Sequence, residues 1–222
     1  MDLIEQLHAF MVATEIDYAI CGGHAIDLFV GKKTRPHKDL DLVVYWEDRD
    51  RLVAHMLADG WDVYEPCGTG YLHKINAVDD QLRIKMNIWC VQSSNPHYTF
   101  TEHEKDMYAV AFDDAEQTEL DFIEFLFNTR QDGAFLFARN HDIKRSLNKA
   151  ILHANGVPYL APELVLLYKS QPADHTENQL DFECAAVKLN AEQRAWLQHA
   201  LAVLFPDGHK WLAKRSSHDP AA

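Results

Sequence analysis

The stretch Asp39-Leu40-Asp41-Leu42-Val43-Val44-Tyr45 limits what this chain can fold into more than any other segment. It begins with polar and apolar residues in alternation and continues as an uninterrupted apolar run. Such a run is typical of a strand buried on both faces, which needs strands beside it and helices packed against it. Residues two apart in a strand point to the same side, so Asp39 and Asp41 are expected to present two carboxylates together. Hard oxygen donors of this kind suit magnesium; the alternative is an exposed strand end in which Asp and Leu happen to alternate.

A diglycine turn precedes this strand. Tyr18 to Cys21 has the composition of a short buried strand, Gly22-Gly23 follows it, and His24 to Val30 has the pattern of a short helix. Glycine lets the backbone approach a phosphate closely, and the first amides of a helix are donors at the positive end of its dipole. Phosphate and metal sites would then share one end of the sheet. The alternative is an ordinary tight turn.

Composition narrows the class of protein. The chain has 222 residues, 47% of them hydrophobic, which is enough for one large domain or two small ones. The formal charge of -13 disfavours a nucleic-acid partner and mildly favours a cationic small molecule, although an acidic surface also serves solubility alone. The four cysteines include no Cys-x-x-Cys pair and the histidines show no metal-binding spacing. With neither a targeting nor a membrane-spanning pattern, we expect a cytoplasmic protein.

The remaining pattern divides the chain into two halves. Strands are expected at 61–64 and 120–127, a hairpin from 71–75 and 82–91, and helices at 3–11, 48–57, 143–153, 178–189, 191–204 and from Pro162 onward. We therefore predict an α+β catalytic domain over residues 1–138 and a helical domain over residues 139–222. The tail after Lys214 is expected to be loose.

Two motifs together resemble the nucleotidyltransferase superfamily. They are Gly22-Gly23-His24-Ala25-Ile26-Asp27-Leu28-Phe29 and Thr34-Arg35-Pro36-His37-Lys38-Asp39-Leu40-Asp41. The nearest branch is the aminoglycoside 2''-adenylyltransferase-like and lincosamide-adenylyltransferase-like group, and the likeness continues through 83–90, 120–128, 156–163 and 166–169. The resemblance implies an α+β fold: a polymerase-β-like palm with a mixed sheet and helices, followed by a helical C-terminal domain.

The same resemblance implies an activity. The family uses two Mg²⁺ ions to move a nucleoside monophosphate, here AMP from ATP, onto a hydroxyl group with release of pyrophosphate. The acceptor would be a small hydroxylated compound such as an aminoglycoside-like or lincosamide-like antibiotic, and the enzyme a monomer or homodimer. Two alternatives are a toxin-like nucleotidyltransferase acting on transfer RNA or protein, and a catalytically silent relative that binds nucleotide.

A third carboxylate is expected on a neighbouring strand, and the segment 120–128 offers Asp121 and Glu124. Their opposite parity means that both cannot face the metal from a regular strand. The resemblance favours Glu124 as metal ligand and proton acceptor, with Asp121 as the second choice. The alternative for Glu124 is a buried ion pair with an Arg or Lys.

Nucleotide contacts are expected from several segments. Gly22, Gly23 and His24 form the predicted phosphate turn, and Arg35 places a positive group beside the aspartates. Lys169 resembles the family's lysine that reaches the triphosphate, although a lysine that merely extends to solvent is the alternative. Asp181 matches an acidic position that holds helices together. The segment 171–179 lacks the arginine and lysine usual in the family.

Overall fold

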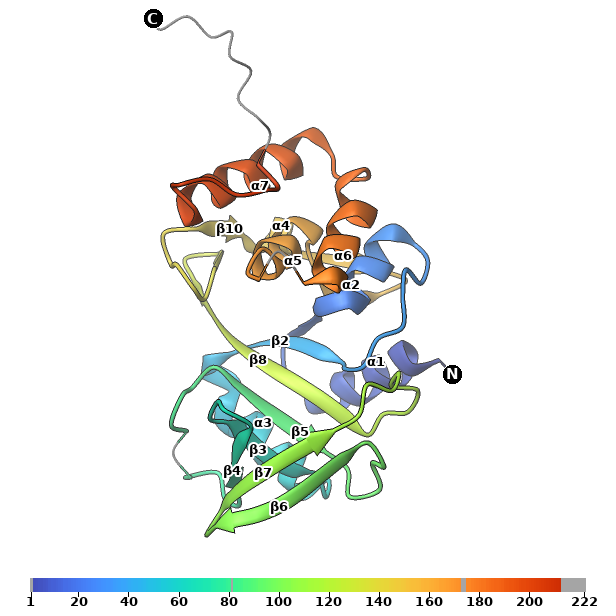
Figure 1. Ribbon diagram of the computed structural model, residues 1–222, viewed down its shortest axis with the longest axis vertical. Helices are drawn as coiled ribbons and strands as arrows, with labels where there is room; N and C mark the ends of the chain where they lie inside the picture. Colours follow the sequence, from blue (N-terminus) through green and yellow to red (C-terminus); the bar gives the residue numbers. More distant parts are fainter. Residues whose placement is uncertain (1, 81, 173–174, 213–222) are drawn as a thin grey trace, which may run out of the picture.

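The computed structural model describes residues 2–80, 82–172 and 175–212. A mixed sheet of 12 strands runs through it in the order β11-β12-β1-β2-β8-β5-β3-β4-β7-β6, with β9 pairing β8 and β10 pairing β9 off this path. Helix α2 lies with α4 to α7 in the upper part of Figure 1, and the larger part of the sheet lies below them. This mixed α+β architecture is the predicted fold class. The tail predicted after Lys214 lies outside the described residues.

The strands and helices have the following bounds. The strands are β1 (Tyr18–Ile20), β2 (Asp41–Tyr45), β3 (Asp62–Pro66), β4 (Tyr71–Ile75), β5 (Asn87–Val91), β6 (Tyr98–Glu104), β7 (Met107–Phe112), β8 (Phe122–Gln131), β9 (Ala134–Leu136), β10 (Lys144–Ser146), β11 (Ile151–Ala154) and β12 (Val157–Leu160). The helices are α1 (Leu3–Thr14), α2 (Gly22–Val30), the 3₁₀ turn η1 (Trp46–Asp48), α3 (Arg49–Ala58), α4 (Leu147–Ala150), α5 (Pro162–Lys169), α6 (Thr176–Ala186) and α7 (Ala191–Leu204).

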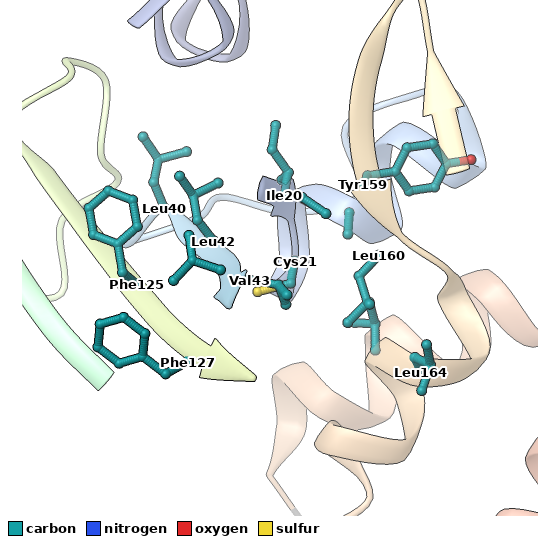
Figure 2. Close-up of a cluster of buried hydrophobic side chains, with 14 of the residues drawn as sticks. Ile20, Cys21, Leu40, Leu42, Val43, Phe125, Phe127, Tyr159, Leu160 and Leu164 are labelled. Carbon is teal, nitrogen blue, oxygen red and sulfur yellow. The ribbon is translucent and has the colours of Figure 1, made fainter. Parts of the chain in front are cut away.

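The two central strands, β2 and β8, run parallel, and one face of each is buried in the main core. Leu42 of β2 pairs with Phe125 of β8, and both side chains are fully buried. Figure 2 shows Leu40, Leu42, Phe125 and Phe127 gathered on the same side. Full burial of a Leu or Phe side chain contributes roughly 1.5–3 kcal/mol each. This packing fixes the register of β2 against β8, and so determines which polar residues share the opposite face.

The far end of the sheet curls back over itself. Tyr98 of β6 stacks on Phe122 of β8 with ring centroids 4.7 Å apart, and Phe100 stacks on Tyr64 of β3 at 4.6 Å. Because β6 is the last strand in the sheet order, these contacts require the hairpin of β6 and β7 to fold over the neighbouring strands. A second, aromatic core results on this side of the sheet.

Three helix ends have distinct caps. Asp2 begins α1 with a capping box to Glu5, and Asn190 begins α7 with the same device to Gln193. Gly31 ends α2 in the left-handed conformation. The diglycine pair is itself the first turn of α2, two residues earlier than predicted.

The helix predicted over residues 143–153 is wrong. Residues 144–146 form β10, 147–150 a single helical turn and 151–154 strand β11, which pairs antiparallel with β12. Asn155-Gly156, a pair that also suits the end of a helix, is the turn of this hairpin, and both residues have positive φ. Strand β12 then pairs parallel with β1, so the later part of the chain adds strands to the sheet as well as helices. The division near residue 138 stays a proposal.

The hairpin predicted from 71–75 and 82–91 is also wrong. Strands β4 and β5 both pair with β3, one on each side of it, and do not pair with each other. Residues 82–86 are not strand; they form a loop anchored on the buried side chain of Glu65. Among the described residues, no helix is long and apolar enough to cross a membrane.

Candidate active site

Two acidic side chains lie opposite each other on β2 and β8. Asp41 and Glu124 are direct partners in the parallel ladder, and Glu124 N donates to the Leu40 carbonyl at 2.8 Å. Directly opposite residues of a ladder share a face, so both carboxylates lie on the side away from Leu42 and Phe125. Asp39 precedes β2 by two residues, and its charge acts on both Asp41 and Glu124.

We call these three carboxylates the acidic trio; the charges of Asp39 and Glu124 act on Asp41, and those of Lys169 and Arg35 oppose them. Burial, followed by the charges of Asp39 and Glu124, raises the pKa of Asp41 well above its usual value. Burial also raises the pKa of Glu124, opposed by the hydrogen bond from Asn87. Carboxylates held this way favour either a proton or a cation between them. The donor set consists of hard oxygens, so it fits magnesium.

The backbone of Gly22 lies directly against the trio. Gly22 has a φ of +61°, and a Cβ on it would lie 2.0 Å from Asp41 Oδ2. Cys21 N donates to the Asp41 carbonyl at 2.8 Å, which ties the turn to β2. Helix α2 starts here without a side-chain cap, so its first amides are donors available to an anion. The structure thus places phosphate-type donors beside carboxylates.

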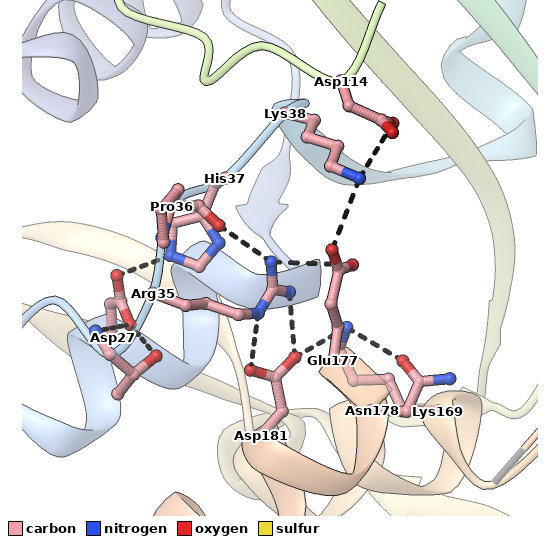
Figure 3. A network of polar contacts seen from close by, with 11 residues as sticks. Asp27, Arg35, Pro36, His37, Lys38, Asp114, Lys169, Glu177, Asn178 and Asp181 are labelled. Carbon is pink, nitrogen blue, oxygen red and sulfur yellow. Dashed lines mark hydrogen bonds and ion pairs between the residues drawn. The ribbon is translucent and has the colours of Figure 1, made fainter. Parts of the chain in front are cut away.

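Arg35 and Lys169 meet at a different acid. Asp181 is fully buried and accepts from Arg35 Nε and Nη2 at 3.0 Å each, while Lys169 Nζ lies 2.9 Å from its Oδ2. Figure 3 shows this network joining the loop before β2 to α5 and α6. Burial alone would raise the pKa of Asp181, but the hydrogen bonds from Arg35 and the charge of Lys169 lower it. The network therefore holds helices α5 and α6 together and to the loop before β2. Holding the helices together is the role predicted for Asp181.

His24 forms a cluster with Asp27 and His37, and the His37 ring lies close to the backbone of Gly23. Asp27 Oδ2 lies 2.6 Å from His37 Nε2, and the rings of His24 and His37 have centroids 4.2 Å apart. Burial, followed by the charge of His37, lowers the pKa of His24 to about 3, so its ring is neutral. One ligand atom from each residue lies within 4.8 Å of the others, a grouping able to hold a metal ion. Sequence spacing gave no sign of this cluster.

Asp121 lies away from the trio. Its side chain accepts from Gln117 Nε2 at 3.3 Å, and its carbonyl accepts from Gln92 N at 2.8 Å. Burial raises its pKa, and the nearby charge of His97 opposes that shift. The structure brings Glu124 to Asp41, and it holds Asp121 in a separate set of contacts.

A cavity of about 560 Å³ opens beside Gly22 and Asp41. Its walls come from β2, the start of β5, β8, the loop after β9 and helix α5, with Lys169 at the end of α5 among the lining residues. Tyr168 is fixed in this wall because its hydroxyl donates to Asn128 Oδ1 at 2.7 Å and accepts from Ala138 N at 3.1 Å.

Sequence reasoning missed three residues around the site: Asn87, Asn128 and Tyr168. Asn87 Nδ2 donates to Glu124 Oε1, and it lies on β5, the strand paired with β8. Its only sequence signal is a polar residue at the start of an apolar run. Asn128 and Tyr168 become visible only once β8 and α5 are packed together.

Comparisons with known proteins test the family resemblance and the fold. Residues 3–67 match the family model of aminoglycoside-2''-adenylyltransferase, a stretch that includes the diglycine turn, Asp39 and Asp41. A comparison with the sequences of curated proteins finds no match. The matched stretch confirms the resemblance to this branch of nucleotidyltransferases.

Solved structures confirm the fold. The lincosamide antibiotic adenylyltransferase LnuA with lincomycin bound is similar at a TM-score of 0.52 and 11% identity, over 84% of this chain and 98% of that one. ANT(2'')-Ia in complex with adenylyl-2''-tobramycin is similar at a TM-score of 0.51 and 16% identity, over 90% and 98%. The solution structure of the antibiotic-resistance factor ANT(2'')-Ia gives 0.50 and 17%, over 92% and 93%. The chain therefore has the α+β fold of these nucleotidyltransferases.

Proposed function

We propose that this protein is a magnesium-dependent nucleotidyltransferase that moves AMP from ATP onto a hydroxyl group of a small molecule. The observation that carries the proposal is the direct pairing of Asp41 with Glu124, beside Asp39 and against the backbone of Gly22. Carboxylates from two strands and a turn able to hold phosphate are the parts that such a transfer needs.

The acidic trio would hold the metal ions. Two Mg²⁺ ions bound there would lower the pKa of the acceptor hydroxyl and neutralise the leaving pyrophosphate. The first amides of α2, at Gly22, Gly23 and His24, would donate to phosphate oxygens. Lys169 lines the cavity and would add a positive charge, even though Asp181 already partners it.

Glu124 would act as the proton acceptor. The acceptor oxygen forms a bond to the α-phosphorus, the bond from that phosphorus to the bridging oxygen breaks, pyrophosphate leaves, and the hydroxyl proton passes to Glu124. A carboxylate whose pKa is raised by burial is a better base than an exposed one. Asn87 would orient Glu124 by its hydrogen bond. Because Arg35 donates to Asp181, the role of Arg35 would be to hold the loop before β2 in position.

Acceptors resembling those in the similar structures are the first to test. Lincomycin and tobramycin stand for the lincosamide and aminoglycoside classes. The purified protein would be incubated with ATP, Mg²⁺ and each compound, with pyrophosphate release and the mass of the product as readouts. An adduct heavier by one AMP, absent in Asp41→Asn and retained in Asp121→Asn, supports the proposal. Pyrophosphate release that is equal in Asp41→Asn and wild type would overturn it.

Bulk transfer RNA belongs in the same panel. The formal charge of -13 gives no general attraction to a phosphate backbone. We therefore expect no transfer of label from ATP to RNA. If RNA became labelled, the acceptor would be RNA and not a small molecule. The proposed metal site would stay the same.

A further inference from the structure

The cavity beside the acidic trio carries mainly positive charge. Lys85, Arg139 and Lys169 line it, and Asp41 is the one carboxylate among its described lining residues. The whole chain has a formal charge of -13, so the charge of this lining is opposite in sign to the net charge of the chain. A cavity with this lining favours an anionic ligand.

Two of these cations have no carboxylate partner in the described part of the chain. Lys169 is paired with Asp181 at 2.9 Å. Arg139 instead donates from Nη1 to the Tyr168 carbonyl at 2.9 Å, and its guanidinium carbon lies 5.6 Å from the Tyr168 ring centroid. No ion pair within residues 2–80, 82–172 and 175–212 involves Lys85. The charges of Lys85 and Arg139 are therefore available to a ligand.

Lys85 lies on a loop that is held in one conformation by a buried acid. Glu65 is fully buried, and its carboxylate accepts from the backbone of Arg83 at 2.6 Å, Ile84 at 2.6 Å and Lys85 at 2.9 Å. Lys85 has a φ of +62°, a conformation that residues with a Cβ rarely adopt. Such conformations persist where the surroundings determine them, and they often occur at binding sites. Glu65 thus fixes the backbone from which Lys85 extends.

We propose that Lys85 and Arg139 form an anion-binding subsite of this cavity that takes a phosphate-type oxyanion. The inference rests on the proposed function, because it assigns the cavity to a nucleotidyltransferase site. The segment 171–179 lacks the basic residues that the family resemblance leads us to expect. Lys85 and Arg139 supply comparable charges from the loop before β5 and the loop after β9.

The anion has two sources with the same chemistry. It is either the phosphate tail of the nucleotide or an acidic group on the acceptor. In both cases an acceptor carrying several ammonium groups finds only Asp41 as a counter-charge among the described residues of the cavity. Neutral or anionic hydroxyl compounds fit this wall better than polycations.

Calorimetric titration of the full chain tests the subsite. Wild type, Lys85→Met and Arg139→Met would be titrated with Mg²⁺ and a nonhydrolysable ATP analogue, and separately with inorganic pyrophosphate. Protein saturated with the analogue would also be titrated with inorganic phosphate. Methionine keeps most of the aliphatic length and removes the charge. Arg83→Met is the matched control, because Arg83 is an exposed cation on the same anchored loop but does not line the cavity. Thermal unfolding would verify that each variant is folded.

The expected result is affinity for the ATP analogue about fivefold weaker in each variant, with Arg83→Met within about twofold of wild type. If only the binding of inorganic phosphate to analogue-saturated protein weakens, the subsite serves an acidic group of the acceptor. Unchanged binding of analogue, pyrophosphate and phosphate in both variants would overturn the subsite.

Failure of the proposed function gives a different result. Wild type would then not bind the ATP analogue with Mg²⁺. The pyrophosphate titration would still decide the subsite: weaker binding in Lys85→Met and Arg139→Met supports it, and binding equal to that of wild type overturns it.

Discussion

Asp41 is partly buried at the cavity and Asp181 is fully buried, and the charges around the two side chains differ. Burial and the charges of Asp39 and Glu124 raise the pKa of Asp41, and the more weakly acting cations Lys169 and Arg35 do not reverse that rise. The neighbours of Asp181 are cations, Arg35 and Lys169, which lower its pKa against the effect of burial. The protein supplies the counter-charge of Asp181 itself. No ion pair within the described residues involves Asp41, so a proton or a bound cation would complete its charge balance, unlike that of Asp181.

The sharpest test of this contrast is Asp41→Asn. Transfer activity should fall about a thousandfold because a charged metal ligand is lost. The folded state should remain as stable as wild type, since the substitution removes repulsion within the acidic trio. Product formation and thermal unfolding of the same preparation measure the two effects. A variant that unfolds but keeps its activity per folded molecule would make Asp41 structural.

The third carboxylate is tested by a pair of substitutions. Glu124→Gln should reduce turnover about a hundredfold, because the proton acceptor and a metal ligand are lost together. Asp121→Asn should remain within about threefold of wild type, since Asp121 makes its contacts with Gln117. Initial rates at saturating ATP compare the two variants. The reverse order would move the third ligand to Asp121.

Substitution at Asp181 should have the opposite profile. Asp181→Asn leaves Arg35 and Lys169 without a buried counter-charge, so the free energy of unfolding should fall by about 3 kcal/mol. The affinity for Mg²⁺ alone should stay close to that of wild type. Urea unfolding and a magnesium titration measure these quantities. Lost magnesium affinity with unchanged stability would place Asp181 among the metal ligands.

The smallest expected effect is a pH dependence. The raised pKa values of Asp41 and Glu124 mean that the folded metal-free protein retains protons that the unfolded chain has released. Their contribution to stability is complete below the ordinary carboxyl pKa and is lost as pH rises through the raised values. For Asp181, whose pKa is lowered, the contribution is present above the ordinary value and is lost as pH falls.

Magnesium should therefore stabilise the protein more at pH 8 than at pH 5. A shift in the unfolding midpoint of about 5 °C is expected at pH 8 with excess Mg²⁺, and a smaller one at pH 5. Asp41→Asn is the control, since it should remove most of the difference between the two pH values. Equal shifts at both pH values in wild type would contradict the charge assignment.

The sequence predicted the parts of the fold that depend on local pattern. The diglycine turn, the strand after Asp39 and the capped helix after Asn190 all have signals within a few residues. Asn155-Gly156 shows where local pattern fails, because the same pair suits the end of a helix and the turn of a hairpin. Pairing with β12 decided between them.

The candidate site was accessible to sequence reasoning only in part. Asp39, Asp41 and Glu124 could be selected by strand parity and family resemblance, although their roles stay predictions. The pairing of β2 with β8 joins residues more than 80 positions apart, and no local pattern encodes it. The anchoring of Lys85 by Glu65 likewise depends on the order of β3 and β5 in the sheet.

The most direct test of the central claim is a crystal structure with a nonhydrolysable ATP analogue and Mg²⁺. The expected result is a divalent cation bound by Asp39, Asp41 and Glu124, with the triphosphate on the first amides of α2. A cation held only by the cluster of His24, Asp27 and His37, or a triphosphate bound away from Gly22, would contradict it.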